Sequence, residues 1–240
     1  MTTQADGRDT RWVEHRAARR RELVEAALRA IRRHGPTVGM DDISAEAGTS
    51  KTVVYRHFGG RTGLYAAVVE SVDQRILDSL GAATAGRDPA TEDPLALVAP
   101  MVDAYLVLVE KDPEIYRFVV TRPLVDGPVE HDPVVGLADR IGEQVTRALE
   151  AHLRRQGRDT ACAPTWGHGL VGFVRAAADQ WLSTEMARPR SAVVADVTTL
   201  FAPALSGAGP AAYPSHSTPA HPSGSTARTD RSTDREDPDA

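Results

Sequence analysis

The chain has 240 residues, of which 41% are hydrophobic and 25% are charged, and this is the composition of a globular protein with a substantial core. The chain has a single cysteine, Cys162, which excludes an internal disulfide and a cysteine-cluster zinc site. The sequence shows no apolar leader and no uncharged apolar run of membrane length, so we expect a cytoplasmic protein with no membrane partner. The net charge of −5 conceals a balance of +4 over residues 1–61 and −9 over the remainder, and a basic end on an acidic body is a first pointer to nucleic acid.

The first part of the chain is predicted to hold one long helix and two short ones. Residues 1–15 are polar and show no period, so we expect a disordered arm. From residue 16 the apolar residues recur at helical spacing up to His34–Gly35–Pro36, which ends the helix because glycine caps helices and proline cannot continue them. Two short helices follow, over 41–47 and 50–58, with a glycine between them.

The rest of the chain is predicted to be helical except for its connections and its end. Apolar residues follow a helical period in six further segments: 62–80, 94–110, 113–120, 133–156, 164–186 and 191–205. Residues 81–93 form a predicted linker and 121–132 a predicted loop. Residues 206–240 contain no Ile, Leu, Val, Phe or Met, so they cannot offset their ordering entropy and are expected to be disordered. We predict an all-α fold of about nine helices with a disordered C-terminal tail.

Residues 40–58 have the layout of a helix-turn-helix, in which two short helices cross at a tight turn. Gly48 permits the left-handed backbone of such a turn, and the small side chain of Ala47 permits a close crossing. The second helix carries side chains suited to DNA. Those expected to face bases are Lys51, Thr52, Val53 and Arg56, and those expected near phosphates are Tyr55, His57 and Arg61. Two short helices around a glycine also occur for packing alone, so the layout by itself leaves a structural role open.

The residue types in this segment are more specific than its layout. Ala47-Gly48-Thr49-Ser50-Lys51, Val54-Tyr55-Arg56-His57-Phe58, and then Arg61 and Leu64 resemble the TetR/AcrR family of bacterial transcriptional regulators. The motif-level resemblance covers about residues 17–70, and beyond it the likeness is one of helix count and size. It implies a helix-turn-helix DNA-binding domain over 16–61 and a helical ligand-binding and dimerisation domain over 62–205, between the two disordered ends.

The resemblance also implies roles within the N-terminal domain. The family's third helix enters the major groove of operator DNA, and the four residues expected to face bases occupy its base-facing positions. Tyr55 and His57 occupy positions that commonly touch the DNA backbone, and Arg61 takes the place of a basic residue that approaches a phosphate. Gly39 stands where the family often has a threonine that caps the second helix and touches a phosphate. Glycine has no hydroxyl for these contacts. Thr37 could substitute for it, or Asp41 could cap the helix instead.

For the body, the resemblance implies a homodimer with a pocket for a small, largely apolar effector. Small and β-branched residues in the last two helices allow close packing across a two-fold axis, although they could equally pack inside one subunit. We expect the dimer interface at Leu170, Val174, Ala177, Val193, Val197, Leu200 and Phe201. The expected pocket residues, each of which could instead be plain core, are Met101, Tyr105, Tyr116, Phe118, Trp166, His168, Phe173 and Trp181. Arg122 is either a contact for an anionic effector or a solvated surface residue.

The function that the resemblance implies is sequence-specific transcriptional regulation by a repressor that an effector releases from its operator. An activator and a helical interaction module, in which the helix-turn-helix is only a scaffold, are the alternatives. The sequence shows no metal-binding spacing, no nucleophile motif and no phosphate-binding loop. We therefore expect no enzymatic activity, no catalytic residues, no metal and no cofactor.

Overall fold

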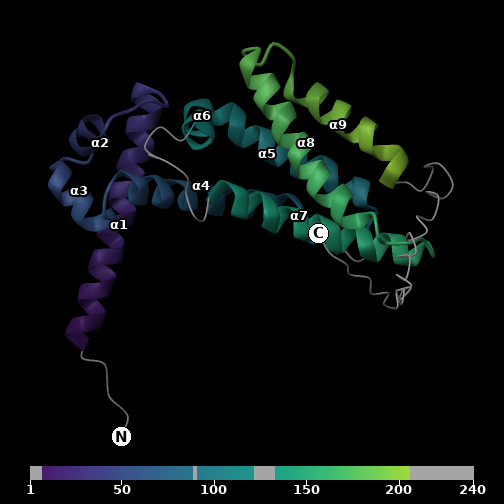
Figure 1. Ribbon diagram of the computed structural model, residues 1–240, viewed down its shortest axis with the longest axis horizontal. Coiled ribbons are helices and arrows are strands. Elements are labelled where there is room, and N and C mark those ends of the chain that lie inside the picture. Colours follow the sequence, from purple (N-terminus) through teal and green to yellow (C-terminus); the bar gives the residue numbers. More distant parts are fainter. Residues whose placement is uncertain (1–6, 89–90, 122–132, 206–240) are drawn as a thin grey trace, which may run out of the picture. The chain divides into compact units, whose positions relative to one another are not determined.

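The computed structural model describes residues 7–88, 91–121 and 133–205, and within these ranges it contains nine α-helices and no β-strand (Figure 1). The predicted all-α fold is confirmed. The helices are α1 (Gly7–His34), α2 (Met40–Glu46), α3 (Lys51–Phe58), α4 (Arg61–Ala83), α5 (Pro94–Lys111), α6 (Pro113–Thr121), α7 (Pro133–Arg155), α8 (Ala163–Ser183) and α9 (Arg190–Leu205). Apart from Thr121, which ends α6, the expected loop over 121–132 lies outside the described residues, as does the expected tail over 206–240.

Helix α1 begins earlier than the apolar period indicates, at Gly7 instead of residue 16. Residues 11–17 are all exposed, so this part of the helix has no buried face that could leave a period in the sequence. A helix extends readily once it has formed, because each added residue adds a backbone hydrogen bond. The guanidinium carbon of Arg16 also lies 5.1 Å from the ring centroid of Trp12. The expected disordered arm is therefore wrong for residues 7–15, and residues 1–6 lie outside the described part.

Helices α1, α2 and α3 form the N-terminal head. The side chains that the helical periods place inside it are buried, among them Leu23, Ile31, Ile43, Val54 and Phe58. Gly48 follows α2 with a φ of +58°, which is the left-handed conformation that favours glycine. At the start of α2 the backbone N–H of Gly39 donates to the carboxylate of Asp42 at 3.2 Å. Asp42 therefore makes the side-chain contact at this helix end, and the alternative in which Asp41 caps the helix is wrong.

The core of the head includes two helices from later in the chain. Leu64 of α4 and Phe118 of α6 lie in the same buried cluster as the three helices of the head. The hydroxyl of Tyr65 in α4 donates to the carbonyl oxygen of Val119 in α6 at 2.8 Å, and the Tyr65 and Phe118 ring centroids are 5.8 Å apart. Packing therefore crosses the domain boundary that we expect at residue 61, because α4 and α6 contact both the head and the body.

The body has a second buried cluster, formed by α5, α7, α8 and α9, in which Leu106, Leu153 and Trp181 are among the most buried large side chains. Helices α7 and α8 approach closely because Gly167 lacks a side chain: a Cβ there would lie 2.4 Å from Oγ1 of Thr146. Helix α4 runs from the head to the body, where it contacts α5 and α7 (Figure 1). Helix α4 is therefore a continuous structural link between the body and the head.

Candidate nucleic-acid interface and effector cavity

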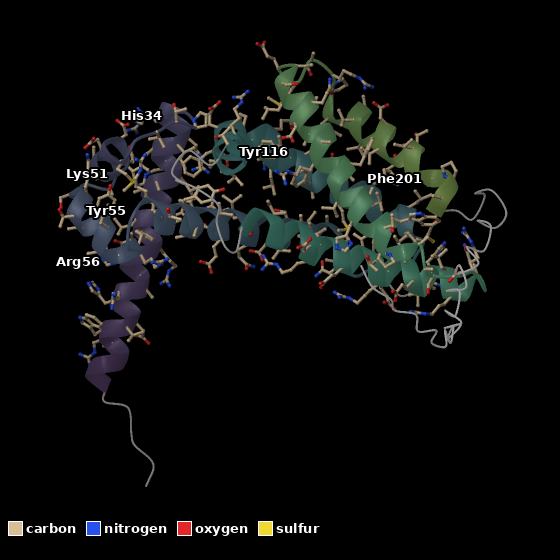
Figure 2. All side chains as sticks on the ribbon, viewed as in Figure 1. His34, Lys51, Tyr55, Arg56, Tyr116 and Phe201 are labelled. Carbon is tan, nitrogen blue, oxygen red and sulfur yellow. The ribbon has the colours of Figure 1, made fainter. Side chains whose placement is uncertain are left out.

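The outer face of α3 is polar and basic, because the helix buries only Val54 and Phe58. Figure 2 shows Lys51, Tyr55 and Arg56 on the outer side of this helix. Most of the residues that we expect at the DNA are exposed: Thr37, Lys51, Thr52, Tyr55, Arg56 and Arg61. The remaining two, Val53 and His57, are half-buried. The structure thus gathers the α3 residues on one accessible surface, with Arg61 at the first residue of α4 and Thr37 in the turn before α2.

Both ends of α3 are fixed by side-chain contacts. At the start, the hydroxyl of Ser50 accepts a hydrogen bond from the backbone N–H of Val53 at 3.4 Å. At the end, Arg20 of α1 donates to the carbonyl oxygen of His57 at 2.7 Å, and its guanidinium carbon lies 4.4 Å from the ring centroid of Phe58. A cation at the C-terminal end of a helix also complements the helix dipole. Helix α3 is therefore anchored to α1, and its outer face is left free.

Lys51 takes part in an ion pair that no sequence pattern indicated. Its Nζ lies 2.6 Å from Oδ1 of Asp41 in α2, and the two side chains are 45% and 82% exposed. Exposed pairs of this kind contribute about 0–1 kcal/mol. A phosphate or a base edge can therefore replace Asp41 with little loss of stability. Periodicity within one helix carries no information on a partner in another, which is why this contact was missed.

Three arginines of α1 add positive charge beside the C-terminal end of α3. Partial burial lowers the pKa of His57, and the charges of Arg56, Arg16, Arg19 and Arg20 lower it further. We did not single out the three α1 arginines from the sequence. Their spacing of three and four residues places them on one side of the helix, and this was the available signal.

A cavity of about 170 Å³ lies between α4, α5, α6, α7 and α8. Most of its lining is aliphatic, and a largely apolar cavity with a few polar groups is the usual form of a small-molecule site. Three of the expected pocket residues line it: Met101, Tyr105 and Tyr116. Leu170 and Val174, which we expected at the dimer interface, also line this cavity.

The other five expected pocket residues do not line this cavity. Phe118 is buried in the head core, and Trp181 is buried in the body core, where its Nε1 donates to a backbone carbonyl oxygen at 2.7 Å. Trp166 packs against the body core, whereas His168 and Phe173 are exposed. A helical period indicates which face of a helix turns inward, but it does not distinguish a packed core from a cavity.

Two ion pairs join the cavity to α1 of the head. Asp112 lines the cavity and accepts two hydrogen bonds from Arg32, at 2.6 and 2.9 Å, which hold the pKa of Asp112 below its usual range. Arg75 also lines the cavity, and its guanidinium lies 2.5 Å from the carboxylate of Glu25. The walls of the cavity are therefore connected to the helix that holds α3.

Two tyrosines form the polar part of the cavity. The hydroxyl of Tyr116 donates to Oδ1 of Asp179 at 2.5 Å, and the Tyr105 ring lies edge-on to Tyr116 with centroids 6.5 Å apart. Burial raises the pKa of both phenols above the ordinary value. Both hydroxyls therefore stay protonated at neutral pH. Figure 2 shows Tyr116 on α6, the helix whose buried side chains also contribute to the head core.

The face of α8 and α9 that we expect at a dimer interface is only partly exposed. Three expected members are buried in the core of their own subunit and do not reach its surface: Leu170, Val193 and Val197. Val174 and Ala177 are half-buried, whereas Leu200 is 58% exposed. Phe173 is 38% exposed and packs edge-on against Phe201, with ring centroids 5.4 Å apart. An apolar patch of Phe173, Leu200 and Phe201 therefore lies on the outer side of the two helices.

Within the described residues, no group of three or more His, Cys, Asp and Glu side chains is placed to hold a metal ion. In the same part of the chain, no helix combines the length and the apolar character needed to cross a bilayer. Arg122, the residue considered for an anionic effector, lies outside the described residues.

Two protein-family models match the chain. Residues 23–68 match the bacterial regulatory proteins of the tetR family, and residues 88–214 match the tetracyclin repressor-like C-terminal domain. An uncharacterised HTH-type transcriptional regulator of Mycobacterium tuberculosis is 35% identical over 187 residues, which are 76% of each chain. The HTH-type transcriptional activator FasR of Mycolicibacterium smegmatis is 30% identical over 178 residues, which cover 71% of this chain and 75% of the relative.

The fold is also found among solved structures. A TetR-family transcriptional regulator from Streptomyces coelicolor has a TM-score of 0.63 to this chain at 21% identity, with 80% of this chain and 82% of the other covered. At that identity the likeness concerns the fold alone, whereas the two family models and the closer relatives account for both halves of the sequence. They confirm the resemblance carried by residues 47–64: the chain belongs to the TetR family of bacterial transcriptional regulators and has its DNA-binding helix-turn-helix.

Proposed function

We propose that this regulator binds operator DNA as a homodimer, with α3 of each subunit in the major groove. The observation that carries the proposal is the exposure of Lys51, Thr52 and Arg56 together on the outer face of α3. Amino, hydroxyl and guanidinium groups are the donors that read base edges, and Val53 supplies an apolar contact. The residues assigned to phosphates are Thr37, Tyr55, His57 and Arg61. The positive charge of the α1 arginines beside His57 supports the proposal that the DNA backbone passes next to His57.

The regulator acts as a repressor that a small, largely apolar effector releases. The two recognition helices of a dimer fit neighbouring half-sites when they lie about 34 Å apart. An effector in the cavity favours a different separation of the heads, so operator affinity falls. Linkage is reciprocal, and operator DNA must weaken effector binding by the same factor.

The contacts between cavity and head support this coupling. Asp112 and Arg75 line the cavity and form ion pairs with Arg32 and Glu25 of α1. A ligand that displaces the walls of the cavity therefore also displaces the carboxylate or guanidinium partners of α1. In terms of the expected domains, residues 16–61 read DNA and 62–205 bind effector and partner, with α4 and α6 contributing to both.

The second candidate is an activator, because FasR, at 30% identity, is named as one. In vitro transcription from a promoter that contains the selected operator separates the two: a repressor lowers the transcript level and an activator raises it. Either activity places the protein with the chromosome in the bacterial cytoplasm.

Arg56→Ala should weaken specific operator binding by about 1–3 kcal/mol per contact and relax the base preference at one operator position. Selection and sequencing of genomic fragments that the purified protein retains defines the operator. Gel shifts over single-base operator variants then measure the profile. Arg147→Ala removes the same charge from the exposed face of α7, where the side chain is 66% exposed, and should change neither affinity nor profile. If Arg56→Ala shows the same base preference at every operator position as the wild type, Arg56 does not contact a base.

Operator binding should also strengthen as the pH falls from about 8 to about 6. The pKa of His57 is lowered in the free protein, so the ring is neutral near pH 7, and a phosphate beside it favours the protonated form and raises the pKa. Binding then takes up a proton, which is worth at most about tenfold in affinity per pH unit for each His57. Fluorescence anisotropy with labelled operator measures this slope.

The matched control for this pH dependence is His34→Gln, at the C-terminal end of α1 (Figure 2). His57→Gln should flatten the dependence of affinity on pH, whereas His34→Gln should preserve it. If His57→Gln retains the wild-type slope, His57 does not lie against the DNA backbone.

A further inference from the structure

One charged side chain of the cavity forms no hydrogen bond or ion pair within the described part of the chain. Four charged residues line it: Asp73, Arg75, Asp112 and Arg175. The first three form ion pairs with residues that do not line the cavity. Among the described residues, no hydrogen bond or ion pair is formed by Arg175, which is half-buried on α8.

Arg175 differs in this respect from the other described arginines of the body. Every other described arginine between residues 62 and 205 makes a hydrogen bond or an ion pair. Asp179 lies one turn further along α8, where it could pair with Arg175. Its carboxylate instead accepts a hydrogen bond from the hydroxyl of Tyr116 at 2.5 Å. A charge beside an apolar cavity loses part of its hydration, and an anion in the cavity would compensate for that loss.

The charge of Arg175 acts at the polar part of the cavity. Burial raises the pKa of Tyr105, while the hydrogen bond with Tyr116 and the charge of Arg175 oppose the rise. Arg175 and the two tyrosines therefore belong to one region of the lining. Apart from the ion-paired residues, the remainder of the wall consists of Val, Leu, Ile, Ala and Met side chains from five helices.

The volume limits the size of a ligand. At about 10–15 Å³ for each water-sized group, a cavity of 170 Å³ holds about 11 to 17 non-hydrogen atoms. We propose that the effector is an aliphatic carboxylate of this size, and that Arg175 binds its carboxylate group. This inference rests on the proposed role of the cavity as the effector site. The planar guanidinium fits a carboxylate through two parallel hydrogen bonds, and the aliphatic wall takes the chain.

Three ligands of equal chain length and different head-group charge test this proposal: decanoate, 1-decanol and decylammonium. In calorimetric titrations of the full chain, we expect decanoate to bind about tenfold or more tightly than 1-decanol, and decylammonium to bind most weakly. Arg175→Gln should weaken decanoate binding about tenfold or more and change 1-decanol binding less than about threefold. Arg147→Gln, on the exposed face of α7, should change neither affinity.

Several results would overturn the inference. Equal affinity for decanoate and 1-decanol, an unchanged decanoate affinity in Arg175→Gln, or no binding of any of the three ligands would each do so. A preference for decylammonium would assign the head group to the acidic residues of the lining. Operator affinity without ligand serves as a separate measurement, because a folded Arg175→Gln variant should keep it. If decanoate binds through Arg175 but leaves operator affinity unchanged, the ligand inference stands and effector-driven release fails.

Discussion

Phe118→Ala is expected to lower the free energy of unfolding by about 3–5 kcal/mol. The Phe118 side chain is fully buried, and it lies in the cluster that contains the helices of the head, with its ring next to Tyr65. Removing the ring leaves a void between α6 and the head, which the surrounding helices can fill only in part. The loss should therefore exceed the usual effect of a single substitution, which is about 1 kcal/mol.

Urea denaturation followed by circular dichroism measures this effect. Trp12→Ala is the matched control, because the Trp12 side chain is 62% exposed and its removal should change the unfolding free energy by less than about 0.5 kcal/mol. The experiment also decides between two roles for Phe118. If Phe118 lines the effector pocket, as the sequence led us to expect, Phe118→Ala should weaken effector binding while the urea midpoint stays near the wild-type value. If Phe118 is a core residue, the substitution should lower the midpoint.

The exposed residues of α3 could be predicted because the information that determines their exposure is local. Val54 and Phe58 are four residues apart on one short helix, so burying them leaves Lys51, Thr52 and Arg56 outside whatever the rest of the protein does. Glycine at position 48 likewise indicates its own backbone conformation, and the structure has a positive φ there.

The composition of the cavity and of the outer face of α8 and α9 could not be predicted in the same way. Phe118 and Tyr116 lie two residues apart on α6, yet one packs in the head core and the other lines the cavity. Val197 and Leu200 lie within one turn of α9, yet one is buried and the other is exposed. Both distinctions depend on which helix packs against each face, and periodicity within one helix does not contain that information.

Leu200→Glu is expected to convert the proposed dimer into monomers and to weaken binding to a complete operator by about 10²–10⁴-fold. Among the residues of the body whose exposure is described, Leu200 is the most exposed large hydrophobic one, at 58%, and Phe173 adds apolar surface beside Phe201. On α8, an added Cβ at Gly169 or Gly172 would meet nothing within 4 Å, so a partner helix has room to approach. A carboxylate at the centre of an apolar contact loses hydration without gaining a partner.

Sedimentation velocity measures the oligomeric state, and operator affinity is compared on DNA with two half-sites and with one. Because the effect arises from losing the second head, Leu200→Glu should bind a single half-site as the wild type does and lose affinity only for the pair. Gln144→Glu places the same charge on the exposed face of α7 and should preserve both the dimer and the operator affinity. If Leu200→Glu remains dimeric, the subunits associate through another surface. If it is monomeric but binds the paired site with wild-type affinity, one head is sufficient for recognition.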